Sequence, residues 1–155
     1  TGARAFKKLK RMVGGFAKFR GKLKRSAKTI RACFDFEVEF EKLAERIGSY
    51  AFLKSAEDVA NSTHQAMVAR YVHVATVANE AASFIAPEIQ AIPKARMRRF
   101  EQSPVLEPYR FQLRKLLRYR CLLYTSDAAD DLLCVDLGGR RTLKKKNTKK
   151  NSLEY

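Results

Sequence analysis

The chain has 155 residues, enough for one domain of ordinary size, and its 32 Lys or Arg against 16 Asp or Glu give a formal net charge of +16. No segment approaches the roughly 18 apolar residues of a membrane-spanning helix, and no apolar run typical of a signal peptide follows the early charges. The three cysteines are widely spaced and odd in number, which favours a reducing, cytoplasmic compartment over a disulfide framework. Because the first residue is Thr1, we expect the natural start to lie upstream.

The positive charge is concentrated in two segments. Residues 1–31 carry +12 and residues 94–120 carry +7, whereas residues 32–93 carry −5 and residues 121–155 carry +2. We therefore expect two basic stretches, one near the start and one in the last predicted helix, and not a uniformly basic surface.

The first predicted helix covers residues 3–20 and is amphipathic, with basic residues between its apolar positions. Gly14 and Gly15 weaken its middle, since each glycine costs about 1 kcal/mol against alanine, and Gly21 is a candidate stop. The apolar stripe consists of Phe6, Leu9, Val13 and Phe16.

A second helix is predicted from Ser26, its candidate cap, to Ile47, where Gly48 ends it. Residues 34–41 also alternate between apolar and acidic side chains, as a strand would. We favour a helix because the 3.6-residue period continues without a turn residue, and a shorter helix over residues 50–60 is expected next. The stripe consists of Phe36, Phe40, Leu43, Ala44 and Ile47.

Ser62 and Gln65 have the spacing of a capping box and predict a helix over residues 63–84. This helix is apolar around most of its circumference, so we expect it at the centre of a bundle. Its narrow polar arc consists of His73, Thr76, Glu80 and Ser83.

Four prolines, at positions 87, 93, 104 and 108, punctuate the rest of the chain. Proline is tolerated in the first turn of a helix, which predicts helices over residues 87–92, 93–102 and 108–120, with a turn near Val105. No hairpin signal occurs, so the predicted class is all-α, an incomplete antiparallel helical bundle. In the last helix the predicted buried residues are Tyr109, Leu113, Leu116 and Leu117, and the predicted solvent-facing ones are Arg110, Arg114, Lys115 and Arg118.

We assign no catalytic, cofactor-binding or metal-binding residue. His64 and His73 lie nine residues apart, which turns them about 180° from each other on a helix and prevents them from sharing a metal. We interpret His73 as a structural residue of the polar arc and His64 as a solvated surface group. Cys33, beside Phe34, is interpreted as a core residue and not as a nucleophile.

The basic first 31 residues leave open an alternative, a basic helical module that binds nucleic acid through phosphate contacts. Against it, Phe6, Phe16 and Phe19 lie near the apolar stripe and are expected in the core, not as stacking platforms for bases. A membrane-surface role is not expected, because the apolar face is needed for packing. A free-standing helical interaction protein is a third hypothesis.

Residues 121–155 do not continue the preceding pattern. Residues 121–141 (CLLYTSDAADDLLCVDLGGRR) resemble the translation of a sequencing adapter, and residues 144–151 can be encoded by A-rich codons, as in poly-A. Thr142 and Leu143 depart from that match. We set this segment aside as a non-native, disordered artefact; the alternative is an acidic loop followed by a basic nucleic-acid-binding tail.

Four segments occur in a distinctive order. They are residues 16–23 (FAKFRGKL), 48–61 (GSYAFLKSAEDVAN), 84–93 (FIAPEIQAIP) and 109–118 (YRFQLRKLLR). They are similar to the aromatic-Arg-Gly-Lys-Leu turn, the Gly-x-Tyr helix junction, the Phe-x-x-Pro-Glu segment and the Tyr-Arg-x-x-Leu helix of one family. Together they resemble the oligoendopeptidase F family of zinc metallopeptidases over about residues 4–120.

The resemblance implies a peptidase that cleaves short peptides, with zinc held by a His-Glu-x-x-His helix and a downstream Glu. In such enzymes zinc lowers the pKa of bound water and the Glu of the motif acts as general base. These residues belong to a carboxy-terminal catalytic domain, which residues 1–120 do not include. We therefore expect a fragment of the helical amino-terminal domain, one wall of the substrate channel, inactive alone, with the zinc and the peptide substrates belonging to the parent protein.

Overall fold

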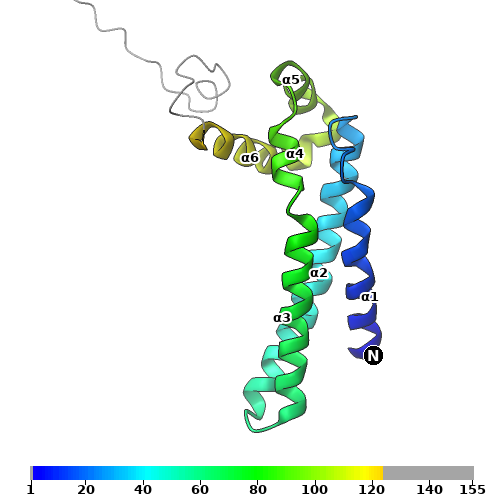
Figure 1. Cartoon of the computed structure of the whole chain (residues 1–155), viewed down its shortest axis with the longest axis vertical. Helices are drawn as coiled ribbons and strands as arrows, with labels where there is room; N and C mark the ends of the chain where they lie inside the picture. Colours follow the sequence, from blue (N-terminus) through cyan, green and yellow to red (C-terminus); the bar gives the residue numbers. More distant parts are fainter. Residues whose placement is uncertain (1, 124–155) are drawn as a thin grey trace, which may run out of the picture.

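The computed structural model describes the backbone of residues 2–123 and the side chains of residues 2–119 (Figure 1). Every regular element in this part of the chain is helical, which confirms the predicted all-α class. The interpretation of residues 121–155 as an artefact falls, apart from the three residues that end the last helix, outside the described residues. In chain order the elements, with η for a 3-10 helix, are α1 (Gly2–Gly15), η1 (Phe16–Lys18), α2 (Ala27–Glu57), α3 (Ser62–Ala82), α4 (Ile85–Gln90), α5 (Lys94–Gln102), η2 (Pro104–Tyr109) and α6 (Arg110–Leu123).

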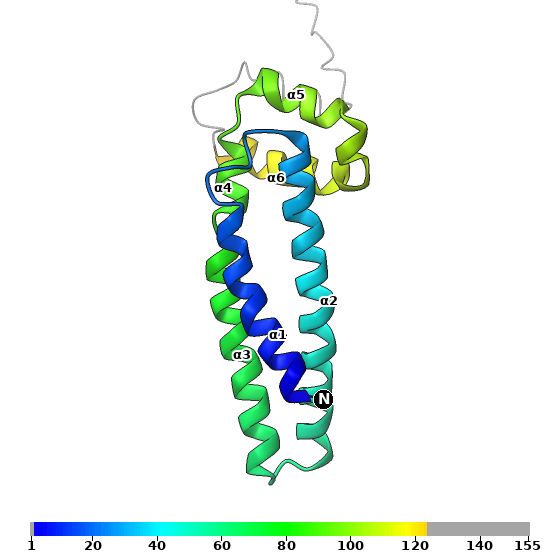
Figure 2. The same cartoon turned by 90° about the vertical axis from the view of Figure 1, so that its right-hand side faces the viewer.

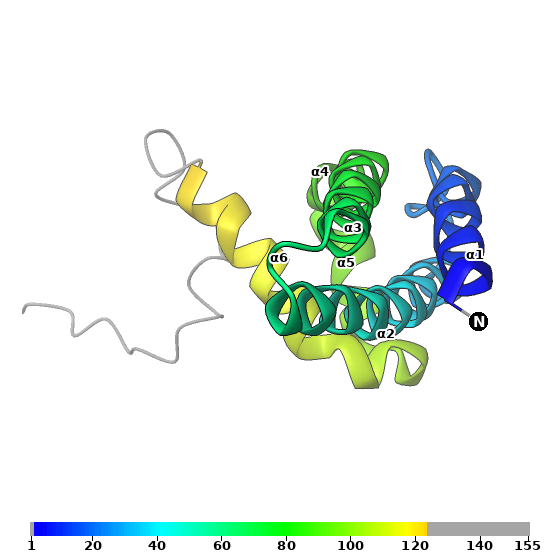
Figure 3. The same cartoon turned by 90° about the horizontal axis from the view of Figure 1, so that it is seen from below.

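Helices α1, α2 and α3 form an elongated three-helix layer in which the chain runs up, down and up again (Figure 2). Helix α1 contacts both α2 and α3, and Figure 3 shows the three helices end-on. The shorter elements α4, α5, η2 and α6 gather at the end of the layer where α1 finishes. There Gly21 turns the chain toward α2 with φ +75°, a left-handed conformation that favours glycine.

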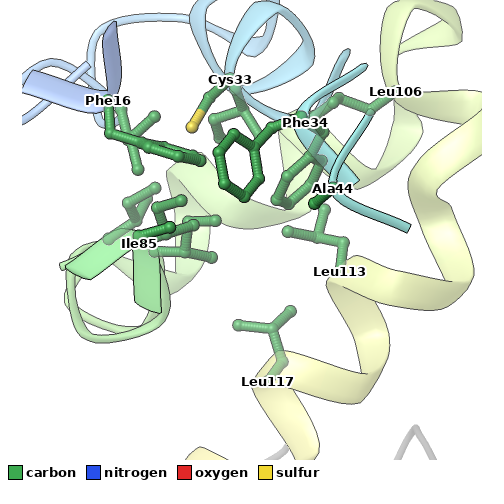
Figure 4. Packing of buried hydrophobic residues seen from close by; sticks show 14 of the residues in the cluster. Phe16, Cys33, Phe34, Ala44, Ile85, Leu106, Leu113 and Leu117 are labelled. Carbon is green, nitrogen blue, oxygen red and sulfur yellow. The ribbon is translucent and has the colours of Figure 1, made fainter. Parts of the chain in front are cut away.

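Most of the hydrophobic core lies at this same end, where the two basic stretches of the sequence meet (Figure 4). Phe16 is almost fully buried, and its ring packs edge-on against Phe36 and Phe40 at centroid distances of 5.0 and 5.5 Å. The apolar stripes predicted for the first two helices therefore do face the core. From α6, Leu113 and Leu117 are buried, as the predicted stripe requires.

Helix α2 is longer than predicted. It continues through Gly48 to Glu57 and so includes most of the residues, 50–60, for which a separate helix was expected. The prediction that Gly48 ends the helix is wrong. A Cβ atom at this position would lie 2.5 Å from Cζ of Tyr71, so the side chain of Tyr71 on α3 packs closely against α2 at this glycine. The choice of helix over strand for residues 34–41 is confirmed.

Helix α3 is not at the centre of the bundle, contrary to the prediction. Only Val74 and Ala78 are buried, and Val72 and Val77 are 48% and 39% exposed. The reason is architectural: α1 and α2 cover one side of α3, and within the described residues nothing covers the other side (Figure 3).

The start of α3 also differs from the predicted capping box. Asn61 is the N-cap, and its side chain accepts hydrogen bonds from the backbone N–H groups of Thr63 and His64. Ser62 is already helical, and the amide of Gln65 donates instead to the carbonyl oxygen of Val59.

The proline-punctuated helices lie close to where they are predicted, although Pro93 precedes α5 as its N-cap and Pro108 lies inside η2. In α6, Arg114, Lys115 and Arg118 are exposed as expected. Arg110 is instead half-buried, because its Nε donates to the carbonyl oxygen of Glu101. Across the described residues, no helix combines the length and the apolar character that a membrane crossing requires.

Candidate functional site

The two histidines lie on α3 and do not meet. His73 is exposed, as its place on the polar arc predicts. His64 is half-buried, and its Nδ1 atom has no hydrogen-bond partner, so the interpretation of this residue as a solvated surface group is wrong. Among the described residues, no three His, Cys, Asp or Glu side chains converge as metal ligands would.

Cys33 is a core residue, as predicted. Its side chain is fully buried beside Phe34, and burial, together with the negative charges of Glu37 and Glu88, raises the pKa of the thiol to about 12. The thiolate is the reactive form of cysteine, so this thiol stays protonated and inert near neutral pH.

Glu88 ties two distant parts of the chain together. Its two carboxylate oxygens accept hydrogen bonds from the backbone N–H groups of Gly21 and Leu23, each at 2.9 Å. Arg20, the neighbour of Gly21, lies over the ring of Phe84 at 5.4 Å. The FAKFRGKL and FIAPEIQAIP segments are therefore joined in space, through the side chains of Glu88 and Arg20.

A second polar cluster joins α2 to η2 at the surface. The hydroxyl of Tyr109 donates to Oδ1 of Asp35 at 2.6 Å, and Nε of Arg31 lies 3.0 Å from the same carboxylate. The hydrogen bond from Tyr109, with that from Arg31 and its positive charge, lowers the pKa of Asp35. Arg31 also donates to the carbonyl oxygen of Val105 at 2.9 Å, so this cluster holds elements together and presents no free base.

The aromatic residues of the basic amino-terminal stretch are packed, as predicted. Phe16 is 1% exposed, and Phe6 and Phe19 pack against the core from its edge. Phe16 therefore offers no open face on which a base could stack, and Phe6 and Phe19 are partly covered by the core.

A groove of about 850 Å³ opens between α1, α2 and α3, at the end of the layer where α1 begins. Its floor is apolar and comes from all three helices, with Phe6 from α1, Leu43 and Ile47 from α2, and Met67 from α3. Such a concave apolar surface with a few charged groups around it is the usual form of a binding site. The cationic residues that line it are Arg4, Lys8, Arg46 and Arg70.

This groove is absent from the sequence-based predictions. Its lining is assembled from residues more than 60 positions apart, and no motif marks them. The sequence feature that could have pointed to the groove is the presence of Arg46 and Arg70 within the acidic block of residues 32–93.

The described residues thus define an all-α protein with a cation-rimmed apolar groove and no recognisable catalytic constellation. Oligopeptidase PepF of Bacillus subtilis (strain 168) is 28% identical to it over 98 residues, which is 61% of this chain and 14% of PepF. The chain therefore matches only a small part of the length of this curated relative. No protein-family model matches the chain, and no solved structure matches it significantly.

Proposed function

We propose that residues 1–120 are a piece of the helical amino-terminal domain of a zinc oligopeptidase of the oligoendopeptidase F type. The distant similarity to PepF and the order of the four family-like segments support this proposal. The parent enzyme would be cytoplasmic and would hydrolyse short peptides.

One structural observation carries the proposal, namely that two of the family-like segments, far apart in the sequence, are hydrogen-bonded to each other. Glu88 of FIAPEIQAIP accepts hydrogen bonds from Gly21 and Leu23 of FAKFRGKL. Residues of a segment that hold the fold together in this way have a structural reason to recur in order, without any catalytic role.

The other two segments contact residues outside the four segments. Gly48 of GSYAFLKSAEDVAN receives the ring of Tyr71, and Tyr109 of YRFQLRKLLR donates to Asp35. The contacts described for the four segments are structural, which supports the proposal that the chemistry of the parent enzyme lies elsewhere in its sequence. In the proposal, zinc and its His-Glu-x-x-His helix belong to the carboxy-terminal catalytic domain, the principal partner of these helices, and this piece alone is inactive.

The test begins with the genomic reading frame that encodes residues 1–120. We expect it to continue beyond Arg120 without the sequence of residues 121–155 and to encode His-Glu-x-x-His downstream. The protein expressed from that frame should bind zinc and cleave a quenched fluorescent peptide, whereas the 155-residue chain should do neither. A genomic frame that encodes residues 121–155 with diverse codons and then stops would contradict both the peptidase proposal and the adapter interpretation.

A further inference from the structure

Each of the three helices around the groove, α1, α2 and α3, contributes at least one positively charged side chain to its lining. Arg4 and Lys8 reach it from α1, Arg46 from α2 and Arg70 from α3, and all four are exposed. Among the described residues that line the groove, none is acidic. In the part of the chain that the structure describes, no ion pair neutralises these four side chains.

Only half of this charge comes from the basic first 31 residues, which contain Arg4 and Lys8, because Arg46 on α2 and Arg70 on α3 lie in the acidic block of the sequence. Residues 32–93 contain four bases and nine acids. Two of the four bases, Arg46 and Arg70, line the groove, whereas none of the nine acids does. On the faces of α2 and α3 that line the groove, the charge is therefore opposite to the net charge of residues 32–93, as expected where an anionic partner is attracted.

The floor of the groove indicates what else the partner carries. Leu43, Ile47 and Met67 are aliphatic, and Phe6 is half-buried against the core, so the floor suits aliphatic side chains better than stacked bases. A flat membrane surface cannot follow a concave floor between three helices. A single fatty acid has one carboxylate, which leaves most of the four separated cations without a partner.

We propose that this groove binds an acidic amphipathic peptide segment of a partner protein, with its aliphatic face on the floor and its carboxylates against the four cations. A helix that presents apolar residues at every third or fourth position, flanked by Glu or Asp, has this chemistry. The inference stands on the groove alone and does not depend on the proposed peptidase function.

The test measures binding to the full 155-residue chain by fluorescence anisotropy. The probe is a labelled peptide of about 16 residues, with Leu along one helical face and Glu on both of its edges. We expect Lys8→Glu combined with Arg46→Glu to weaken binding by about tenfold or more. The matched control, Lys7→Glu with Lys42→Glu, makes the same charge change on the same two helices outside the groove and should lose less than about twofold.

The apolar contribution is tested without a change of charge. Met67→Gln on the floor should weaken binding, whereas Val72→Gln on the exposed face of the same helix should not. Circular dichroism of each variant shows whether the fold is kept, and surface substitutions of this kind are expected to keep it.

Three results would overturn the proposal. They are an equal loss in the groove variant and its matched control, equal binding of a scrambled peptide of the same composition, and tighter, groove-dependent binding of a single-stranded oligonucleotide or of phosphatidylserine vesicles. The last result would assign the groove to a nucleic acid or a membrane surface instead.

Discussion

Gly48 illustrates how a single residue controls the distance between two helices. It lies in the interior of α2, where glycine costs about 1 kcal/mol against alanine in backbone propensity alone. This cost is offset by packing, because the ring of Tyr71 occupies the space that a side chain at position 48 would fill. Replacing the glycine would force the ring or the whole of α3 to move.

We therefore predict that Gly48→Ala destabilises the protein by about 1–3 kcal/mol, since overpacking outweighs the gain in helix propensity. Gly14→Ala is the matched control: Gly14 is also helical, and nothing lies within 4 Å of the position that its Cβ would take. This variant should be neutral or up to about 1 kcal/mol more stable. Urea unfolding followed by circular dichroism measures both, and a stabilised Gly48→Ala would contradict the packing argument.

Tyr109 links the stability of the fold to alkaline pH. Burial and the hydrogen bond to the charged Asp35 raise the pKa of its hydroxyl from 10.0 to about 12. Because the folded-state pKa is the higher one, the contribution of Tyr109 is complete below pH 10 and is lost as the pH rises from 10 toward 12.

Tyr109→Phe should accordingly be less stable than the wild type at about pH 9, and this difference should shrink by about 1 kcal/mol at about pH 11.5. Tyr119→Phe, at an exposed tyrosine on α6, serves as the control and should show no such pH-dependent difference. Urea unfolding at the two pH values gives the comparison. A constant difference between wild type and Tyr109→Phe would show that the Asp35 contact does not stabilise the protonated hydroxyl.

Among the elements, α4 is attached to the turn after η1 by apolar packing and by the carboxylate of Glu88. Glu88 lies in the first turn of α4 and bonds two backbone N–H groups that no helix or strand would otherwise satisfy. Hydrogen bonds to a charged acceptor are stronger than neutral ones. The turn and the short helix therefore stabilise each other.

Glu88→Ala is predicted to cost about 2–3 kcal/mol, because it removes two charge-assisted hydrogen bonds at once. Glu88→Gln keeps one oxygen acceptor and should cost about half as much. Glu80→Ala, at an exposed position on α3, is the control and should change stability by less than about 0.5 kcal/mol. Thermal unfolding monitored at 222 nm distinguishes the three, and equal melting temperatures would show that the clamp is not stabilising.

For the molecule as a whole, most of the core lies at the end where α1 finishes, and large apolar side chains are exposed elsewhere on α2 and α3. On α2, Phe52 and Leu53 are 52% and 65% exposed, and on α3 Val72 is 48% exposed. Phe52 and Leu53 line one shallow hollow together with Tyr71, and exposed apolar surfaces of this kind mark places that associate with another protein. In the proposed parent enzyme, the catalytic domain would cover them.

We predict that the isolated chain self-associates at micromolar concentrations and melts in a broad, only partly cooperative transition. Leu53→Gln combined with Val72→Gln should shift it toward the monomer in sedimentation equilibrium. Lys7→Gln with Lys42→Gln, at exposed polar positions, should leave the association unchanged. A sharply melting monomer of the unmodified chain would refute the expectation.

The faces of the helices follow from local sequence, because the apolar period of a helix determines which side chains must leave water whatever the helix packs against. Phe16, Phe40 and Leu113 are buried for this reason, and the all-α class and the approximate bounds of the short helices were predictable in the same way. The burial of Cys33 was also predictable from its local sequence.

Contacts between distant segments were not predictable, because each depends on a partner that local sequence does not identify. Gly48 looks like a helix end until Tyr71 is known to lie against it, and α3 looks like a central helix until the bundle leaves one of its sides bare. The groove exists only because three helices bring their cations and aliphatic side chains together. Periodicity specifies which face is buried, whereas the neighbour that buries it is chosen by the packing of the whole chain.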